Sequence, residues 1–443
     1  MKILRFTASH ISVIFASLFV MTLVSPYLNS AGHGIRNSWA VYSLWLLTTF
    51  FWNHGSLNNT YIELKRRKYE VFSLVSWLIV VILNAVLTHG FTGDLHFFTM
   101  LTMSMVIFMQ ISYSAQRDGS ASVLLVTVIL IGVEVLRSIP TLWSQPALAR
   151  IIMGVAATPE MIAEAGVASV GQYGYYTGLA IVLPIIVTRA VVSNGTKAIA
   201  LWIIAGAIAF AVSIATFMGA ILLMFLGLVI LGIFHITYAK SSIKTLLLYV
   251  GAVAVLVVTS MSVLGEIEQV SYVADKATNQ FSGIKDRGIK EGDVTERSDL
   301  FGLSFNTFLE NPLLGVGPVT NRENPILFTK IGGHSSWLDQ LAEYGMLGFC
   351  FYILFIGLVI RRITKSFLLE KKISDIKICC LGQLTSCFLF ILGGIYNPVI
   401  VVTEIFVLFY FMSSISATSF KGMKSASETA MVKNPTLIHI IRP

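Results

Sequence analysis

The residues best suited to chemistry lie late in the sequence, in the segment Gly332–Phe349. Ser336 and Asp339 have the spacing of a capping box, which predicts that a helix starts directly after His334. The free N–H groups at a helix N-terminus favour nearby anions and disfavour a protonated imidazole. A neutral imidazole can accept the proton of a hydroxyl group. We therefore interpret His334 as a candidate general base; the alternative is an ordinary loop histidine at a wet interface.

Arg297 and Glu343 are the next candidates on either side of this histidine. A planar guanidinium such as that of Arg297 can clamp a phosphate or diphosphate with two hydrogen bonds. The simpler interpretation of Arg297 is a solvated cation among several others in a polar segment. Glu343 lies four residues after Asp339, on the same helical face, and carboxylates at such a depth are often functional. Asp339 itself is explained as the capping partner, whereas Glu343 has no such explanation.

Motifs for metal and nucleotide chemistry are absent from the sequence. It contains neither a G-x-x-x-x-G-K-[ST] phosphate loop nor a D-x-D pair, and its four cysteines form no CxxC pair. We therefore expect a reaction without metal or cofactor, on a substrate that is already activated or carried by the membrane.

The elements that must position these residues are membrane helices. The 443 residues are 55% hydrophobic and 12% charged, with a mean hydropathy of +0.78, whereas a soluble domain carries about 25% charged residues. Apolar runs long enough to cross a bilayer recur along the chain. The fold class is therefore all-α, a polytopic membrane protein of about 12 transmembrane helices. The predicted spans are roughly 9–28, 38–53, 71–88, 97–114, 120–138, 173–191, 198–214, 217–237, 245–264, 336–360, 376–394 and 398–416.

Charge predicts the orientation of these spans. With both termini in the cytoplasm, 21 of the 31 Lys and Arg residues fall on the inner side, as the positive-inside rule requires. The same rule explains the net charge of +8 without nucleic acid. We interpret the first apolar run as a signal anchor, because it lacks a clear cleavage site. The protein is thus expected in an inner membrane with one large periplasmic loop.

The chain divides into four parts on this interpretation. They are an N-terminal membrane bundle of about nine spans, the periplasmic loop, three C-terminal spans and a cytoplasmic tail, at residues 1–264, 265–335, 336–416 and 417–443.

Two helices are predicted outside the spans. Thr158 followed by Pro159 is typical of a helix start. In the long loop, aromatic residues from Phe301 to Phe308 recur at helical spacing after Arg297, and Pro312 follows the end of that segment.

The combination of these motifs resembles the O-antigen ligase/polymerase superfamily. An arginine-led aromatic helix precedes PLLGVGP at 312–318, and HSSWLDQLAEYGMLGF follows at 334–349. The matching residues are Arg297, Pro312, Gly315, Gly317, His334, Ser335, Leu338, Glu343, Gly345 and Gly348. One departure is Met218, which stands where many members carry an arginine at the outer start of a span. Arg150 or Arg137 is then expected to supply the missing cation.

The resemblance implies a C-type, metal-independent glycosyltransferase that uses a glycan on undecaprenyl diphosphate at the periplasmic face of the bacterial inner membrane. It implies His334 and Glu343 as catalytic residues, and as substrate-binding residues Arg297, Arg150, Arg137 and Ser335, with no metal ligand. The implied partners are the lipid-linked glycan, the bilayer, and flippase and chain-length regulator proteins, with no nucleic acid.

Three functions remain open from the sequence. We prefer a polymerase of lipid-linked repeat units, because most sequences of the superfamily are of that kind. The first alternative is a ligase that passes the glycan to lipid A-core or to protein. The second is a flippase or transporter, for which the sequence lacks the expected internal pseudo-symmetry.

Overall fold

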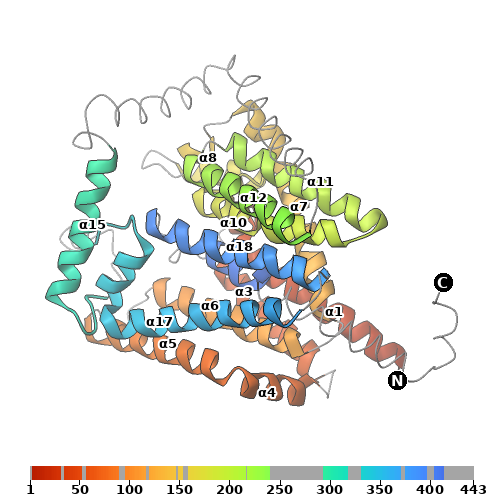
Figure 1. The fold of residues 1–443 in the computed structure, drawn as a ribbon, viewed down its shortest axis with the longest axis horizontal. Helices are drawn as coiled ribbons and strands as arrows, with labels where there is room; N and C mark the ends of the chain where they lie inside the picture. The colour runs from red at the N-terminus through yellow and green to blue at the C-terminus, as the bar shows by residue number, and fades with distance from the viewer. Residues whose placement is uncertain are drawn as a thin grey trace.

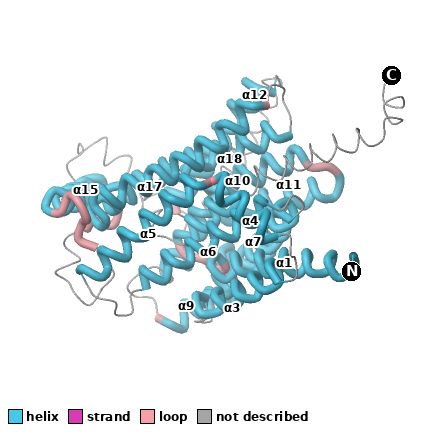
Figure 2. The backbone as a smooth tube through the Cα atoms, turned by 90° about the horizontal axis from the view of Figure 1, so that it is seen from below, coloured by secondary structure: helices cyan, strands magenta, loops and turns pink. Residues whose placement is uncertain are grey.

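The computed structural model describes residues 2–30, 34–51, 56–88, 95–115, 119–145, 148–152, 158–215, 217–239, 293–317, 331–370, 375–396 and 404–413. Every regular element in these ranges is a helix (Figure 2). The first half contains α1 (Lys2–Val24), α2 (Pro26–Ser30), α3 (Gly34–Leu46), the π-helix η1 (Leu47–Phe51), α4 (Ser56–Arg66), α5 (Lys68–Thr88), α6 (Leu95–Ala115), α7 (Gly119–Ser144), α8 (Leu148–Ile151) and α9 (Pro159–Val167). The second half contains α10 (Tyr173–Val192), α11 (Gly195–Ile214), α12 (Met218–Ala239), α15 (Asp293–Glu310), α17 (Ser336–Leu369) and α18 (Asp375–Tyr396), followed by the helix Glu404–Ser413.

These helices indicate a multi-pass membrane protein. Five are long and apolar enough to cross a bilayer, namely Ser122–Ser144, Tyr173–Val192, Gly195–Ile214, Ser336–Leu369 and Asp375–Tyr396. Shorter apolar helices are His10–Val24, Thr102–Tyr113, Met218–Phe234 and Glu404–Ser413. The predicted count of 12 is not established by these helices, and the predicted span 245–264 and much of the long loop lie outside the described residues.

Three boundaries predicted from the sequence agree with the structure. The apolar stretch of the seventh and eighth spans is divided, because α11 ends at Ile214 and α12 begins at Met218. Helix α9 begins at Pro159, and the Thr158 hydroxyl caps it by accepting a hydrogen bond from the Met161 N–H at 3.3 Å. The aromatic helix of the long loop is α15, which begins two residues before the predicted Thr295.

Helix α10 forms the centre of the bundle, where every residue from Gly174 to Ala190 is buried. A helix that is apolar on all sides must be covered on all sides, and α11, α12 and α18 pack against it. Pro184 removes one backbone donor in its middle, and the Thr188 hydroxyl donates to the Pro184 carbonyl at 2.9 Å. Helix α18 approaches closely at this point, because a Cβ on Gly382 would overlap the Thr188 hydroxyl.

Helices α5 and α17 run antiparallel along one side of the bundle (Figure 1). Near one end, Arg362 Nε donates to Glu70 Oε1 at 3.0 Å. Near the other end, Asn84 Nδ2 donates to the Glu343 carbonyl at 2.9 Å. Helix α15 stands across this second end and packs against α17. We call the end of the bundle that contains Asn84 and Glu343 the site end.

Helices α10 and α18 bring further residues to the site end. Trp337 Nε1 donates to the Ile391 carbonyl at 3.0 Å, so the last turns of α18 lie beside the start of α17. The Ser386 hydroxyl donates to the Ile181 carbonyl at 2.7 Å. Gly382 of α18 lies against Thr188 of α10, whereas the later Ser386 contacts the earlier Ile181. Helix α18 is therefore antiparallel to α10. The start of α10 at Tyr173 therefore also lies at the site end.

The opposite end contains a buried polar network. The Arg67 guanidinium, 4% exposed, donates to Glu63 Oε1 at 2.8 Å and to Gln110 Oε1 at 3.0 Å. The Tyr410 hydroxyl donates to the same Gln110 oxygen at 3.4 Å. A buried charge is tolerated when hydrogen bonds and an opposite charge surround it. The network thus joins the helix Glu404–Ser413 to the turn between α4 and α5 and to α6.

Candidate active site

The site begins with a break in α17. Gly345 has φ 61° and ψ −170°, which lie outside the helical region and separate a short first part of α17 from its long second part. A break in a helix leaves backbone N–H and C=O groups on both sides without helical partners. The segment Asn311–Gly317 forms hydrogen bonds with these groups. Four backbone hydrogen bonds join the two segments, namely Val316 N to Ala342 O (2.9 Å), Gly317 N to Glu343 O (2.9 Å), Met346 N to Pro312 O (2.8 Å) and Leu347 N to Leu313 O (3.2 Å).

Two glycines allow the segment Asn311–Gly317 and the start of α17 to lie this close together. We call the set of four backbone hydrogen bonds between them the interlock. A Cβ on Gly315 would overlap the carbonyl of Glu343, and a Cβ on Gly345 would overlap the carbonyl of Leu313. Both glycines also have positive φ, at 72° and 61°, which other residues adopt at a cost. These two glycines are among the residues that match the family pattern. Each is required because the backbone of the other segment lies directly against it.

Asn84 in α5 holds the interlock from the side. Its amide is 1% exposed, and its two N–H groups donate to the carbonyls of Leu314 and Glu343. One side chain thus connects the loop segment, the first part of α17 and α5. The sequence does contain a signal for this role, because a lone amide inside the apolar run 71–88 requires buried partners.

Asp339 organises the loop that carries His334. Its Oδ1 accepts hydrogen bonds from the Ser304 hydroxyl at 2.7 Å and from the Gly333 N–H at 3.3 Å. Its Oδ2 accepts from the Ser335 N–H at 3.3 Å. The residues on both sides of His334 are thereby held by one carboxylate that is 2% exposed, while His334 itself stays partly exposed.

Ser304 connects the same carboxylate to α15. Its hydroxyl donates to Asp339 and accepts from the Gly332 N–H at 2.9 Å. Gly332 is also pressed against α15, because a Cβ there would overlap the Leu300 carbonyl. Ser304 was not among the residues predicted from the sequence, although it lies two helical turns after Arg297 on the same helix.

The cap of α17 differs from the prediction by one residue. Ser335, not Ser336, is the N-cap, and its hydroxyl accepts from the Leu338 N–H at 3.5 Å. Asp339 reaches back to the Ser335 N–H as a capping-box partner would, but across four residues instead of three. The Ser335 hydroxyl therefore has a structural role, and its predicted role in substrate binding stays a prediction.

Glu343 is buried beneath this loop, at 7% exposure. Its Oε2 accepts from Gln340 Nε2 at 3.4 Å, and its backbone carbonyl belongs to the interlock. Arg297 belongs to α15, on the helical face that also carries Ser304; its side chain lies outside the described part of the structure. Helix α15, which carries Arg297, thus packs against the start of α17, which carries Glu343 and directly follows His334 and Ser335.

Arg150 lies beside the position of the missing family arginine. Its guanidinium is 5.9 Å from the ring centroid of Phe217, the residue directly before Met218. The same ring packs against Tyr173 and Tyr176 at the start of α10, with ring centroids 5.5 Å and 6.0 Å away. Because α10 starts at the site end, Arg150 belongs to that end too.

Arg137 has a different environment. Its guanidinium lies 4.5 Å from the ring centroid of Tyr27, and its helical neighbour Glu134 accepts from the Ser25 hydroxyl at 2.8 Å. These contacts join α7 to the chain that follows α1. Among the described residues, no group of three or more His, Cys, Asp or Glu side chains could hold a metal ion.

Comparison with known proteins gives one finding about the family. Residues 199–353 match the family model described as O-antigen ligase. This range runs from α11 into α17 and includes Arg297, His334, Glu343 and the interlocked glycines. No curated protein matches the chain. The matched family covers ligases and polymerases of O-antigen, which are glycosyl-transferring enzymes. Over these residues the match supports the resemblance of this chain to the O-antigen ligase/polymerase superfamily.

Proposed function

We propose that the protein polymerises oligosaccharide repeat units carried on undecaprenyl diphosphate at the periplasmic face of the inner membrane. The matched family supports glycosyl transfer in an O-antigen pathway. The choice of polymerase over ligase is our inference from the wider superfamily, and the product is O-antigen, capsule or exopolysaccharide.

The observation that supports the proposal most strongly is the loop around His334, which buried hydrogen bonds hold in place. A buried carboxylate, a serine from α15 and a helix cap fix both neighbours of the histidine. An ordinary surface histidine needs no such support. Pre-organised supporting contacts are what a general base requires.

The proposed reaction is a single transfer. An acceptor sugar hydroxyl attacks the anomeric carbon of the donor glycan, and its proton moves to His334. The new glycosidic C–O bond forms as the bond between the anomeric carbon and the diphosphate oxygen breaks. The lipid diphosphate leaves with the electron pair, and cations stabilise its developing charge.

Arg297 and Arg150 are the proposed cations for this leaving group. Arg297 is on the helix that supports the His334 loop. Arg150 lies beside Phe217 and so brings a guanidinium from α8 close to the position of Met218. We assign Arg137 a lesser role, because its guanidinium packs on Tyr27. Glu343 is the second proposed catalytic residue, within the first part of α17.

Glycan banding in a deletion strain tests the proposal. Without a polymerase, the ladder of long chains disappears and a single capped repeat remains. Without a ligase, all capping of lipid A-core disappears, and that outcome replaces our proposal with the alternative. Loss of all banding together with substrate retained on the cytoplasmic side identifies a flippase instead.

A purified assay tests the metal-independent chemistry. Transfer from the lipid-linked donor should proceed in EDTA, since arginine guanidinium groups replace a divalent cation at the diphosphate. Loss of transfer in EDTA with recovery on adding magnesium contradicts this mechanism.

A further inference from the structure

Helix α15 packs against α17 through its polar face. Ser304 and Thr307 are buried, at 1% and 4% exposure, whereas Phe305 and Leu309 on the other face are 46% and 58% exposed. A helix that is held by the hydrophobic effect buries its apolar residues instead. The hydrogen bonds of the polar face therefore matter more for the position of α15 than they do for an ordinary surface helix.

The Ser304 hydroxyl makes two of these hydrogen bonds. It donates to Asp339 Oδ1 at 2.7 Å and accepts from the Gly332 N–H at 2.9 Å. The same carboxylate oxygen accepts from the Gly333 N–H at 3.3 Å. One hydroxyl thus connects α15 with the first turn of α17 and with the loop that leads to His334.

Ser304 lies halfway between Arg297 and the end of α15. The chain that leaves α15 enters the segment Asn311–Gly317, which the interlock holds against α17. At 1.5 Å per residue, Ser304 is about 10 Å and Arg297 about 20 Å from this held end. A tilt of α15 by about 5° around the held end therefore moves Arg297 by about 2 Å. Misplacement of a binding group by about 1 Å can reduce a rate about 100-fold.

The contacts around Ser304 oppose such a tilt in both directions. A Cβ on Gly332 would overlap the Leu300 carbonyl, so α15 cannot move closer to the loop. Movement of α15 away from the loop breaks the two hydrogen bonds of Ser304. Because Gly332 is two residues before His334, loss of these bonds also releases the chain that carries the histidine.

We propose that Ser304 is a positioning residue that fixes the distance between Arg297 on α15 and His334 on the neighbouring loop. The inference deepens the proposed transfer reaction and rests on it, because Arg297 is the proposed donor clamp and His334 the proposed base. Ser304 itself contacts neither substrate. Its hydroxyl acts on the donor through α15, and on the acceptor through Asp339 and Gly332.

Ser304→Ala removes the hydroxyl but favours the helix itself, because alanine has the highest helix propensity. The affinity for the lipid-linked donor should fall about tenfold, the usual effect of losing one buried hydrogen bond to a charged group. The kcat should fall as well, because the Gly332 N–H loses its acceptor. Asp339→Asn keeps an oxygen for Ser304 and should lower kcat with little change in donor affinity. This difference between the two variants separates the position of α15 from that of the loop.

Hydrogen exchange of the purified full chain measures the same connection without any donor. The N–H groups of Gly333 and Ser335 bond to Asp339 and not to Ser304. Ser304→Ala should nevertheless speed their exchange, together with that of α15, because the loop and the helix are held by one set of contacts.

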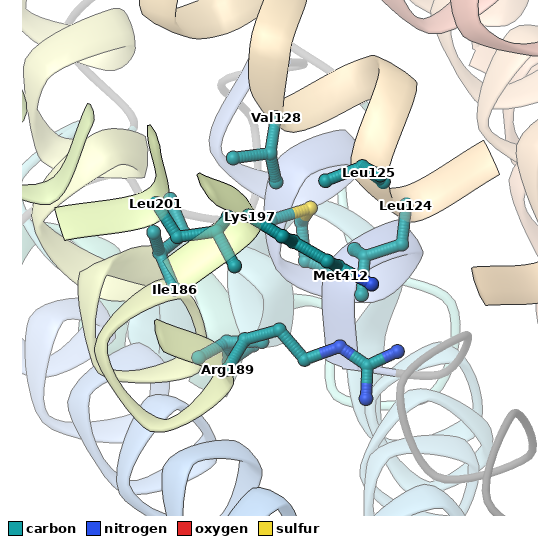
Figure 3. A pocket seen from close by; sticks show the side chains of 9 residues that line it. Leu124, Leu125, Val128, Ile186, Arg189, Lys197, Leu201 and Met412 are labelled. Carbon is teal, nitrogen blue, oxygen red and sulfur yellow. The ribbon is translucent and has the colours of Figure 1, made fainter. Parts of the chain in front are cut away.

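Two control variants accompany Ser304→Ala. Asn306→Ala makes the same kind of change on the exposed face of α15 and should alter neither donor affinity nor exchange at Ser335. Lys197→Gln tests for non-specific attraction of the anionic donor to a distant cation. Lys197 lines a small hollow together with Arg189, which is in the last turn of α10 and so away from the site end (Figure 3). It should bind the donor as the wild type does.

Three results overturn the positioning role. They are wild-type donor affinity in Ser304→Ala, an equal loss of affinity in either control, and faster exchange in α15 with unchanged exchange at Gly333 and Ser335. A wild-type protein that binds no lipid-linked donor contradicts the proposed function instead. Faster exchange at Gly333 and Ser335 in Ser304→Ala would then still support the connection between α15 and the loop.

Discussion

At the scale of single residues, the site depends as much on Asp339 and Asn84 as on the residues proposed to react. Asp339 accepts hydrogen bonds from both neighbours of His334, and Asn84 donates to two carbonyls of the interlock. Both side chains are buried, and each makes at least two hydrogen bonds. Such residues fix the place of a reacting group without touching the substrate.

The first prediction concerns His334. His334→Ala should reduce transfer by about 100- to 10,000-fold, the usual contribution of a general base. Membrane insertion should be normal, because the side chain is partly exposed on a loop. Polymer yield from a lipid-linked donor measures the effect, and donor binding should persist. A variant that makes polymer of wild-type length and amount would show that His334 is an ordinary loop residue and would direct attention to Glu343.

The second prediction concerns Arg297. Arg297→Lys keeps the charge but loses the planar pair of donors, so donor affinity should fall clearly. Arg297→Ala should lose donor binding altogether. Equilibrium binding of the lipid-linked donor measures both variants, with His334→Ala as the control that still binds. Full affinity in Arg297→Lys would show that a point charge is sufficient.

The third prediction separates positioning from chemistry at Asp339. Asp339→Asn keeps one acceptor oxygen, but its NH2 group must face an N–H donor of the loop. An unsatisfied buried group costs about 1–3 kcal/mol, so the loop should be displaced and turnover should fall about tenfold or more. The KM for the donor should change little, because Asp339 makes no proposed contact with it. A change in KM alone, with normal turnover, would contradict the positioning role.

At the scale of elements, the interlock of α17 with the segment Asn311–Gly317 determines the geometry of the site. The break at Gly345 lets two backbones exchange hydrogen bonds as neighbouring strands do, inside an otherwise helical protein. The start of α17 is therefore attached to α5 and to the end of α15. A continuous helix could not bind the loop segment in this way, because its backbone groups would already be paired.

The fourth prediction tests the interlock with a pair of glycines on one helix. Gly345→Ala requires a positive φ of 61° and a Cβ that overlaps Leu313, so we expect a loss of stability of about 2 kcal/mol or more. Gly357→Ala meets no atom within 4 Å and should be neutral or stabilising, because alanine favours a helix. Thermal unfolding compares the two variants. Equal midpoints would contradict the interlock.

Sequence patterns predicted the elements better than their contacts. Capping residues and helical spacing located α9 and α15, because these signals are local. The division between α11 and α12 was predicted because their combined apolar stretch is too long for one membrane helix. The predicted cap of α17 was wrong by one residue, since Ser335 and Ser336 are equally good capping residues. The hydrogen bond from the Ser335 N–H to Asp339 determines which of them caps the helix. Glycine spacing marked the interlock, but its partner segments lie about 30 residues apart in sequence and meet only through packing.

At the scale of the whole molecule, the two ends of the bundle differ in chemistry. The site end collects the start of α17, α15, Arg150 and the start of α10. The opposite end holds the network around Arg67. The charge distribution predicts that this second end is cytoplasmic. Sequence alone could assign each residue to a side, but not show which residues on that side are neighbours.

The fifth prediction tests that orientation. Alkaline-phosphatase fusions near Gly292 should be active, because the enzyme folds only in an oxidising compartment. Fusions near Lys371 should be inactive. The reverse result would place the His334 loop in the cytoplasm and remove the basis for a periplasmic transfer reaction.

The network around Arg67 also bears on how the protein is made. The helix Glu404–Ser413 leaves the ribosome after every other described helix, yet nine of its ten residues are buried and Tyr410 contacts the partner of Arg67. Without that helix, its buried neighbours lack a packing partner and Gln110 loses one hydrogen-bond donor. The helices that precede it in the sequence are therefore incompletely packed until it has been made.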